Sequence, residues 1–515
     1  MVRVAELLGS LSLATDLSDG FSLEKSLRTT VLATRLARRV TDDPEEVRRA
    51  YWAALARHAG CTAFAHEEAR YYSAGDDRSL RATLAYVDFD RPSMFVGRAL
   101  RDIAPRASIG ERARALGRLL SPGVPRQHAL AQCDGGVAFA RAVDLPEVAE
   151  VLRLREERWD GRGPRGIAAG EALPLAARVA DVADVAELYA WSFGIEEALA
   201  ELGRRRGGAL DPRLVDLFVA EAPAIYVGIH GSSAWDAFLD AEPEPWLVAG
   251  EGGGPGLGAI LAAFGRIADL TSVHTLGHAQ AVAEVARAGA AALGLGDADQ
   301  TLAELAGLAH DLGRVAISVG IWDKRGALSP YERERVRTHS QQTETILRLA
   351  PSLEHIADAA AHVHERGRGD GYHRRVAISS TPAIARLVGA ADVYVALGSD
   401  RAHRPRFSAR AREKELVRMA ASGDLDAASV EAILDAPRAA RGRRPSNPLG
   451  LTDREVEVVR LVAVGRTNPE IGRLLGISPR TAQRHVMNVY DKLGVESRAG
   501  LALIAMQHRL LDDDT

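Results

Sequence analysis

Histidine and carboxylate residues are concentrated in one stretch of helical sequence pattern, and this constrains the fold more than any other feature. The 515-residue chain has 15 histidines, of which nine lie between positions 274 and 403. His274 and His278 are four residues apart, so in a helix they share one face. His310 and Asp311 are adjacent inside the apolar helical pattern "ELAGLAHDLGRV". Such a pattern places ionisable groups in a core, where an unpaired carboxylate is costly.

We predict that these side chains converge on a divalent metal ion. Imidazole nitrogens and carboxylate oxygens brought together from several helices are ligands for transition metals. Water bound to such a metal is a nucleophile near neutral pH and can attack phosphorus. For any single histidine, an ordinary core or surface role is the simpler interpretation, but the ordered set favours a metal site. The predicted metal ligands are His274, His278, His310, Asp311, His339, His364 and Asp392.

Residues 270–400 resemble an HD-type metal-dependent phosphohydrolase domain of the HD-GYP branch. The resemblance implies a site with several iron, manganese or similar ions that hydrolyses cyclic di-GMP, and in which His310, Asp311 and Arg314 are catalytic. Several positions differ from the family pattern: Arg314 replaces a lysine, Val363 a histidine, Arg368 an aspartate and His274 a glutamate, and "GYH" at 371–373 replaces GYP. The matching residues are His278, His310 with Asp311, His339, His364 with Glu365, and Asp392.

The first part of the chain looks like a second copy of this domain. "LARHAG" at 55–60 aligns with "LAHDLG" at 308–313, and "AARVADVADVAELY" at 176–189 aligns with "IARLVGAADVYVAL" at 384–397. The offset falls from 253 to 208 residues, so the first copy has 253 − 208 = 45 additional residues. The alternative is chance similarity between Ala-rich helices, which the common order of the matches disfavours.

In the first copy, Arg57 and His58 stand where the middle domain has its His–Asp pair. A fixed guanidinium charge at that place would repel a metal ion. We therefore expect a degenerate HD-like domain that has a structural, regulatory or ligand-sensing role and binds no metal.

The C-terminal segment predicts a helix-turn-helix. Two capping boxes, Thr452 with Glu455 and Thr467 with Glu470, begin consecutive short helices, and Ser478 caps a third. Residues 441–515 have 12 Lys or Arg and 9 Asp or Glu, a net charge of +3 in a chain whose total is −4. The exposed face of the third helix combines cations for phosphates with polar groups that read base edges. The predicted DNA-binding residues are Arg480, Thr481, Gln483, Arg484, His485, Asn488 and Lys492.

This segment closely resembles the LuxR-type DNA-binding domain. The matching stretches are "LTDREVEVV", "GRTNPEIG", "LLGIS", "TAQRHVMNVYDKLGV" and "SRAGLA". The resemblance implies four helices, of which the last commonly serves dimerisation, and it places Arg484, His485 and Lys492 on the DNA side.

The composition supports a helical protein of the cytoplasm. Ala and Leu dominate the apolar residues while aromatics make up 5%, which favours helices over strands. No run approaches the ~20 apolar residues of a membrane span. Cys61 and Cys133 are far apart, which suits a reducing compartment. We predict an all-α chain in four parts: a degenerate HD-like domain (1–245), an HD-GYP-like domain (259–436), a basic linker (437–449) and a LuxR-type domain (450–515).

We expect a homodimeric transcription regulator that binds double-stranded DNA and whose middle domain senses or hydrolyses a nucleotide or cyclic dinucleotide. Two alternatives stay open. The chain could be a metal-dependent phosphodiesterase or phosphohydrolase with an accessory DNA-binding domain, or a catalytically inactive HD scaffold.

Overall fold

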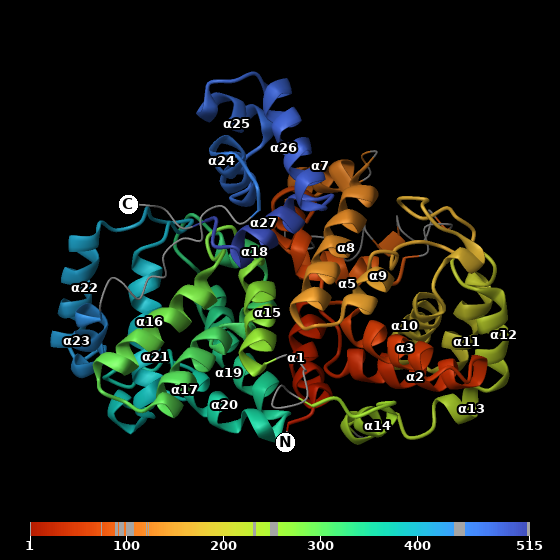
Figure 1. Cartoon of the computed structure of the whole chain (residues 1–515), viewed down its shortest axis with the longest axis horizontal. Helices are drawn as coiled ribbons and strands as arrows, with labels where there is room; N and C mark the ends of the chain where they lie inside the picture. Colours follow the sequence, from red (N-terminus) through yellow and green to blue (C-terminus); the bar gives the residue numbers. More distant parts are fainter. Residues whose placement is uncertain are drawn as a thin grey trace. The chain divides into compact units, whose positions relative to one another are not determined.

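The computed structural model describes residues 2–73, 75–87, 91, 97–98, 108–119, 121, 123–229, 233–247, 256–436 and 449–511. Apart from isolated bridges, all regular structure in these ranges is helical, which confirms the predicted all-α fold (Figure 1). No helix in the same ranges combines the length and apolar character needed to cross a bilayer. The predicted basic linker lies almost wholly outside the described residues.

The chain divides into two compact units, Met1–Leu257 and Gly258–Thr515, called here the N-terminal unit and the C-terminal unit. The predicted limits of the middle and C-terminal domains stay predictions. The N-terminal unit has the α-helices α1 (Val4–Asp19), α2 (Lys25–Val40), α3 (Pro44–Ala56), α4 (Ala65–Glu67), α5 (Asp77–Leu84), α7 (Ile109–Leu119), α8 (Val124–Ala142), α9 (Pro146–Leu152), α10 (Leu175–Phe193), α11 (Ile195–Arg205), α12 (Pro212–Ala220), α13 (Ala222–Ile225) and α14 (Trp235–Ala241).

The C-terminal unit contains a larger helical bundle and four further helices at its C-terminal end. The bundle helices are α15 (Leu257–Asp269), α16 (His278–Ala292), α17 (Asp297–Ala309), α18 (Val319–Trp322), α19 (Pro330–Arg348), α20 (Glu354–Ala361), α21 (Ala383–Leu397), α22 (Ala409–Ala421) and α23 (Ala427–Asp435). The four later helices are α24 (Asp453–Ala463), α25 (Asn468–Leu475), α26 (Pro479–Leu493) and α27 (Arg498–Gln507).

Small residues let the bundle helices approach closely. A Cβ on Gly307 of α17 would lie 2.6 Å from the Cα of Ala283 of α16, so these two helices meet at backbone distance. Val282, Leu387 and Val388 belong to the buried core that α16 and α21 share. This packing is dense and tolerates little added volume. It fixes the start of α16, the end of α17 and the middle of α21, from which the candidate metal ligands project.

The capping signals in the C-terminal segment are confirmed. Thr452 with Glu455 and Thr467 with Glu470 form capping boxes at the starts of α24 and α25. Ser478 caps α26 through the backbone N–H of the residue three positions on. Capping satisfies backbone donors that a helix cannot satisfy itself, so these residues define where each helix begins.

Candidate metal centre and DNA-facing helix

The predicted metal ligands lie at helix ends more often than within helices. His278 is the first residue of α16, whereas His274 lies in the preceding turn, so the prediction that the two share a helix face is wrong. α17 ends at Ala309, and His310 and Asp311 follow it, so the expectation of a His–Asp pair inside a helix is also wrong. The sequence does not show this helix end, because the 3-10 turn that follows it (Leu312–Ala316) is also buried. The apolar pattern therefore continues beyond the last residue of α17.

Six of the seven predicted ligands come together in one buried cluster. Asp311 Oδ1 lies 3.2 Å from His339 Nε2 and 3.6 Å from His364 Nε2. Asp311 Oδ2 lies 3.6 Å from His310 Nε2 and 3.8 Å from His278 Nε2. Ligand atoms of His278, His310 and Asp311, and separately of Asp311, His339 and His364, lie within 4.8 Å of one another. Asp311 therefore lies between two sets of ligand atoms.

The distal carboxylate joins this cluster from α21. Asp392 Oδ1 lies 3.1 Å from His278 Nε2 and 3.9 Å from His310 Nε2, while its Oδ2 lies 3.8 Å from His364 Nδ1. His274 is not among the residues whose ligand atoms gather here; its backbone carbonyl accepts a hydrogen bond from Arg401 Nη1 at 3.5 Å. His274 as a metal ligand therefore stays a prediction.

Hydrogen bonds orient two of the imidazoles with Nε2 toward the carboxylates. His310 Nδ1 donates to the carbonyl oxygen of Gly307 at 2.7 Å, and His339 Nδ1 donates to that of Val336 at 2.5 Å. These bonds leave each Nε2 facing Asp311, at 3.6 Å for His310 and 3.2 Å for His339. His310 Nε2 and Asp311 Oδ1 are buried and have no hydrogen-bond partner. Imidazole nitrogens and carboxylate oxygens gathered in a core, two of them without a hydrogen-bond partner, are the arrangement that a cation stabilises, so these residues fit a divalent metal.

The protonation states favour metal binding as well. Burial lowers the pKa of His364 to about 4, and burial also lowers the pKa of His278, so both rings are neutral at pH 7. For Asp311, burial alone would raise the pKa, but His310 and Arg314 hold it well below its usual value. Neutral imidazoles and an ionised carboxylate are the forms that bind metal.

Two arginines flank the cluster. Arg314 Nη1 lies 3.2 Å from Asp311 Oδ2, and its guanidinium lies 3.7 Å from the centroid of the Trp322 ring, which fixes its orientation. Arg401 is further along the chain; burial and then the charge of Arg314 lower its pKa to about 10, so it stays cationic at pH 7. Sequence reasoning missed Trp322 and Arg401, because neither follows an apolar period or a ligand spacing.

The segment around "GYH" is ordered by one carboxylate. Glu365, which is buried, accepts hydrogen bonds from the backbone N–H groups of Arg374, Arg375 and Val376 at 2.8–3.2 Å. Tyr372 in this segment stacks on His364, with ring centroids 5.0 Å apart. The segment therefore supports one ligand although it departs from the GYP pattern.

The predicted DNA-binding face of α26 is accessible within the chain. Five of its residues are exposed and two, Thr481 and His485, are half-buried; the exposed ones are Arg480, Gln483, Arg484, Asn488 and Lys492. Lys492 differs from the others because its Nζ lies 2.8 Å from Glu455, the capping residue of α24. Lys492 thus also ties α26 to α24.

Comparisons with known proteins support both parts of the C-terminal unit. Residues 263–428 match the HD domain family, and residues 449–505 match the luxR family of bacterial regulatory proteins. A 3'3'-cGAMP-specific phosphodiesterase 3 of Vibrio cholerae is 29% identical over 406 residues, covering 78% of this chain and 87% of that protein. A cyclic di-GMP phosphodiesterase of Pseudomonas aeruginosa is 35% identical over 139 residues, covering 26% of this chain and 33% of its own length.

Other relatives are similar in the last helices or in fold. The transcriptional regulatory protein MctR of Rhizobium johnstonii is 38% identical over 79 residues, 15% of this chain and 36% of that protein. A crystal structure of a cyclic GMP-AMP specific phosphodiesterase from V. cholerae superposes with a TM-score of 0.56 at 24% identity, covering 84% of this chain and 97% of the other, which shows a shared fold. The chain therefore carries an HD domain followed by a C-terminal helix-turn-helix domain of the LuxR family.

Proposed function

We propose that this chain is a DNA-binding transcription regulator whose HD domain, of the HD-GYP type, binds divalent metal and acts on a 3',3'-linked cyclic dinucleotide. The observation that carries the proposal is the buried cluster around Asp311, in which His310 Nε2 and Asp311 Oδ1 have no hydrogen-bond partner and four imidazoles lie around one carboxylate. The proposed ligands are His278, His310, Asp311, His339, His364 and Asp392.

Charge distribution around the cluster suits a phosphodiester. Divalent ions held by these ligands would supply Lewis-acid polarisation of a phosphoryl oxygen and neutralise charge that develops on it. Arg314 and Arg401 add fixed positive charge at the edge of the cluster, where they would orient a phosphate. Because Arg314 is held by both Asp311 and the Trp322 ring, little conformational freedom is lost when it binds a phosphate.

The substrate class follows from the relatives, whose names state hydrolysis of 3'3'-cGAMP or cyclic di-GMP. We propose the same class for this chain. The test is chromatographic detection of linear dinucleotide after incubation of the full chain with each compound and Mn²⁺ or Fe²⁺. Release of linear product supports an enzyme; tight binding without product supports a sensor; neither binding nor product supports the inactive HD scaffold and contradicts the proposal.

The LuxR-type domain is proposed to bind duplex DNA through α26, as a homodimer on paired half-sites. The support is the exposed cationic and amide face of this helix, whose own start is capped by Ser478 and which follows two helices that begin with capping boxes. Homodimerisation and the promoter sequence stay predictions.

Replacing Arg484 by Ala is expected to weaken DNA binding and reduce the slope of log K against log salt by about one, since each phosphate contact releases about one counterion. Lys492→Ala should reduce the slope less, because its charge is already paired with Glu455. Fluorescence anisotropy with promoter DNA at several salt concentrations measures both. Arg418→Ala, an exposed arginine of α22, is the matched control. Equal slopes for wild type and Arg484→Ala would exclude α26 as the docking face.

A further inference from the structure

The N-terminal unit repeats the framework of the metal centre with different side chains. Asp269 accepts a hydrogen bond from the backbone N–H of Ala279, the residue after His278, at 3.1 Å. Exactly 253 positions earlier, Asp16 accepts one from the N–H of Ser26, the residue after Lys25, also at 3.1 Å. Lys25 is the first residue of α2, as His278 is of α16. Lys25 therefore stands at the place of a metal ligand.

Close helix contacts follow the same correspondence. A Cβ on Gly313 would lie 2.0 Å from the carbonyl oxygen of His339, and a Cβ on Gly60, 253 positions earlier, would lie 2.0 Å from that of Gln132. The alignment pairs Asp184 of α10 with Asp392 of α21. The two units thus share these backbone contacts, and they differ in the side chains at the corresponding positions.

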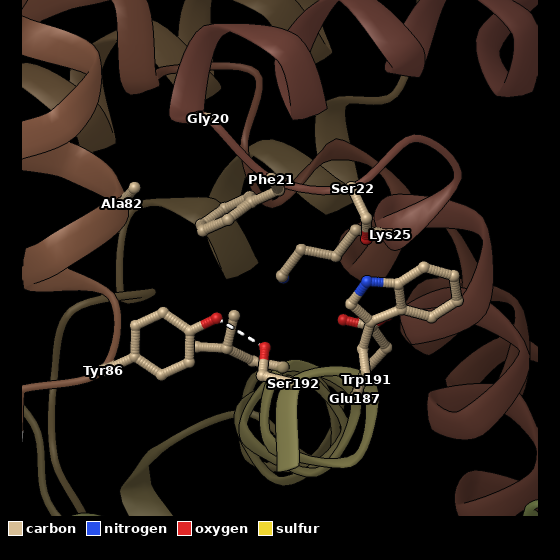
Figure 2. Close-up of a pocket in the computed structure, with 10 residues that line it drawn as sticks. Gly20, Phe21, Ser22, Lys25, Ala82, Tyr86, Glu187, Trp191 and Ser192 are labelled. Atoms are coloured by element: carbon tan, nitrogen blue, oxygen red, sulfur yellow. Dashed lines mark hydrogen bonds between the residues drawn. The ribbon is translucent and has the colours of Figure 1, made fainter. Parts of the chain in front are cut away.

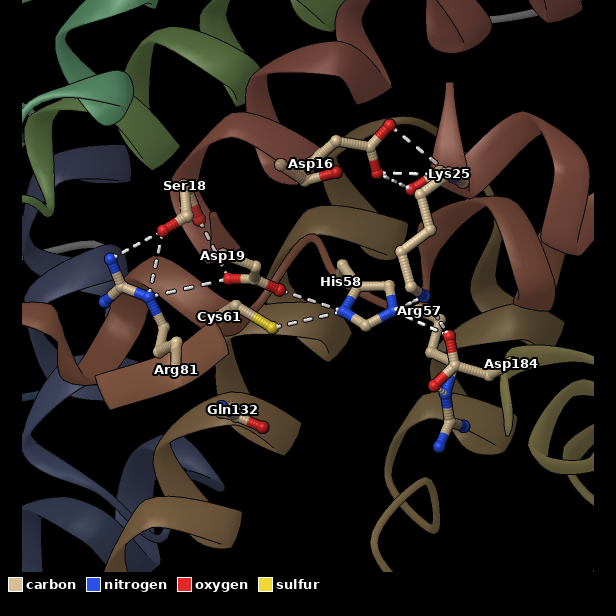
Figure 3. A network of polar contacts seen from close by, with 12 residues as sticks. Asp16, Ser18, Asp19, Lys25, Arg57, His58, Cys61, Arg81, Gln132 and Asp184 are labelled. Carbon is tan, nitrogen blue, oxygen red and sulfur yellow. Dashed lines mark hydrogen bonds and ion pairs between the residues drawn. The ribbon is translucent and has the colours of Figure 1, made fainter. Parts of the chain in front are cut away.

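In the N-terminal unit, basic side chains surround Asp184, the carboxylate that corresponds to Asp392. Lys25 Nζ forms a short ion pair with Asp184 Oδ1, and it is 1% exposed. His58 Nε2 lies 3.0 Å from the same oxygen, and Arg57 Nε lies 3.4 Å from Oδ2. Figure 3 shows these side chains gathered around Asp184. Two further carboxylates balance the charge: Asp19 lies 3.0 Å from His58 Nδ1, and Asp181 lies 2.6 Å from Arg57.

The same arrangement explains the protonation of His58. Burial and Lys25 lower the pKa of His58, but Asp184 and Asp19 raise it further, to about 10. Both ring nitrogens of His58 are engaged within the chain: Nδ1 with Asp19 at 3.0 Å, and Nε2 with Asp184 at 3.0 Å and with Lys25 Nζ at 3.2 Å. At the place of Asp311 the N-terminal unit thus has a cation instead of an anion.

The N-terminal unit also has a second cluster of side chains of the types that bind metal, which could argue for an ion in this unit. Asp19, His58 and Cys61 have ligand atoms within 4.8 Å of one another, which is close enough to hold an ion. However, Arg81 Nε lies 3.6 Å from Asp19, and Arg155 Nη1 lies 3.6 Å from Cys61 Sγ. Two guanidinium groups already supply the positive charge that an ion would bring, so they oppose a further cation.

Lys25 also lines a pocket of the N-terminal unit. This pocket, of about 210 Å³, opens beside it, with walls that include Phe21, Tyr86 and Trp191 (Figure 2). Lys25 lines this pocket, whereas Asp184 and His58 are not among its walls. An ion that enters this pocket meets the Lys25 ammonium group and the Glu187 carboxylate, whereas Asp184 does not line the pocket.

We propose that Lys25 is the built-in cation of the N-terminal unit: its ammonium group, paired with Asp184, takes the structural place of the metal, so this unit folds and stays folded without any metal ion. The prediction from sequence had assigned the repelling charge to Arg57 alone; the structure gives the central contact to Lys25, while Arg57 also pairs with Asp181.

Hydrogen exchange of the full chain, read by mass spectrometry, tests the proposal. Adding EDTA is expected to leave protection of α2 and α10 unchanged. Loss of protection there on adding EDTA would overturn it. Exchange in α16 and α21 is read in the same experiment, and a lack of response there would count against the proposed metal centre only, so the two failures are distinguishable.

A double-mutant cycle tests the Lys25–Asp184 pair itself. Lys25→Met should lower protection of α2 by at least tenfold in the wild-type background but by at most about threefold in an Asp184→Asn background, since the cost comes from removing one cationic partner of a buried carboxylate. Equal losses in both backgrounds would mean that Lys25 only packs, and would overturn the proposal. Lys324→Met, which breaks a partly exposed ion pair with Glu332, is the matched control and should change protection little.

Metal analysis tests whether the N-terminal unit binds an ion at Asp19, His58 and Cys61. In a His310→Ala/Asp311→Ala chain loaded with Zn²⁺ or Mn²⁺ and dialysed, we expect the same metal content with and without an added Cys61→Ala substitution. A stoichiometric ion that disappears with Cys61→Ala would show that the N-terminal unit binds metal at Asp19, His58 and Cys61, and would overturn the proposal.

Discussion

Replacing Asp311 by Ala is expected to reduce stably bound metal to about one-tenth of the wild-type amount or less, and to abolish any hydrolysis of cyclic dinucleotide. Asp311 is 4% exposed, and its two oxygens face four imidazoles. Its removal takes a ligand from both three-residue groups at once, and even outer partners of metal ligands are worth about 10- to 100-fold in affinity. Metal per chain is measured by mass spectrometry after dialysis.

Two further variants show whether the loss of metal comes from the Asp311 carboxylate itself. Asp358→Ala, which removes a partly exposed carboxylate of α20, is the control and should retain wild-type metal. Asp311→Asn keeps the shape while removing the charge, and it should also lose metal. An Asp311→Ala chain with unchanged metal content would show that the ligand assignment is wrong.

Replacing Gly313 by Ala is expected to have the second-largest effect, because it forces backbone atoms apart. The added Cβ would lie 2.0 Å from the carbonyl oxygen of His339 and 2.6 Å from the amide nitrogen of Thr343. Overpacking of this kind costs about 1–3 kcal/mol, which corresponds to a fall in the unfolding midpoint of roughly 2–12 °C for a unit of this size. The shift of α19 should also displace His339 and lower metal affinity.

Differential scanning fluorimetry with and without Mn²⁺ measures both effects. Gly326→Ala, where the added Cβ meets open space, is the matched control and should behave as wild type. A Gly313→Ala chain as stable as the control, with the same metal content, would contradict the close approach of α19 to this turn.

Much of the fold followed from local sequence signals. The capping pairs Thr452–Glu455 and Thr467–Glu470 were predicted correctly, because a cap is a contact between residues three apart. The convergence of His278 and Asp392 was also predicted, although 114 residues separate them. This prediction rested on the order of histidine and aspartate residues along the chain. Helical periodicity relates only residues a few positions apart and could not have given it.

The remaining features of the centre depend on tertiary packing. Apolar periodicity continued across the end of α17, so the chain's departure from the helix before His310 was not visible in the sequence. Trp322 ends the short helix α18, and Arg401 lies in the connection between α21 and α22, so neither carries a repeating sequence signal. Lys25 was missed for a different reason: the 253-residue offset, extended back from "LARHAG", pairs it with His278, but a lysine is not a residue type that suggests a metal site.

Three ligands of the centre, His278, His310 and His364, stand at or just beyond helix ends. The corresponding places in the N-terminal unit carry Lys25, the first residue of α2, and Arg57, just after the end of α3. In the proposed arrangement the two units balance their buried carboxylates by different means: one takes an ion from the surroundings, and the other carries the charge in its own sequence. The helical scaffold of the N-terminal unit is then independent of the supply of metal.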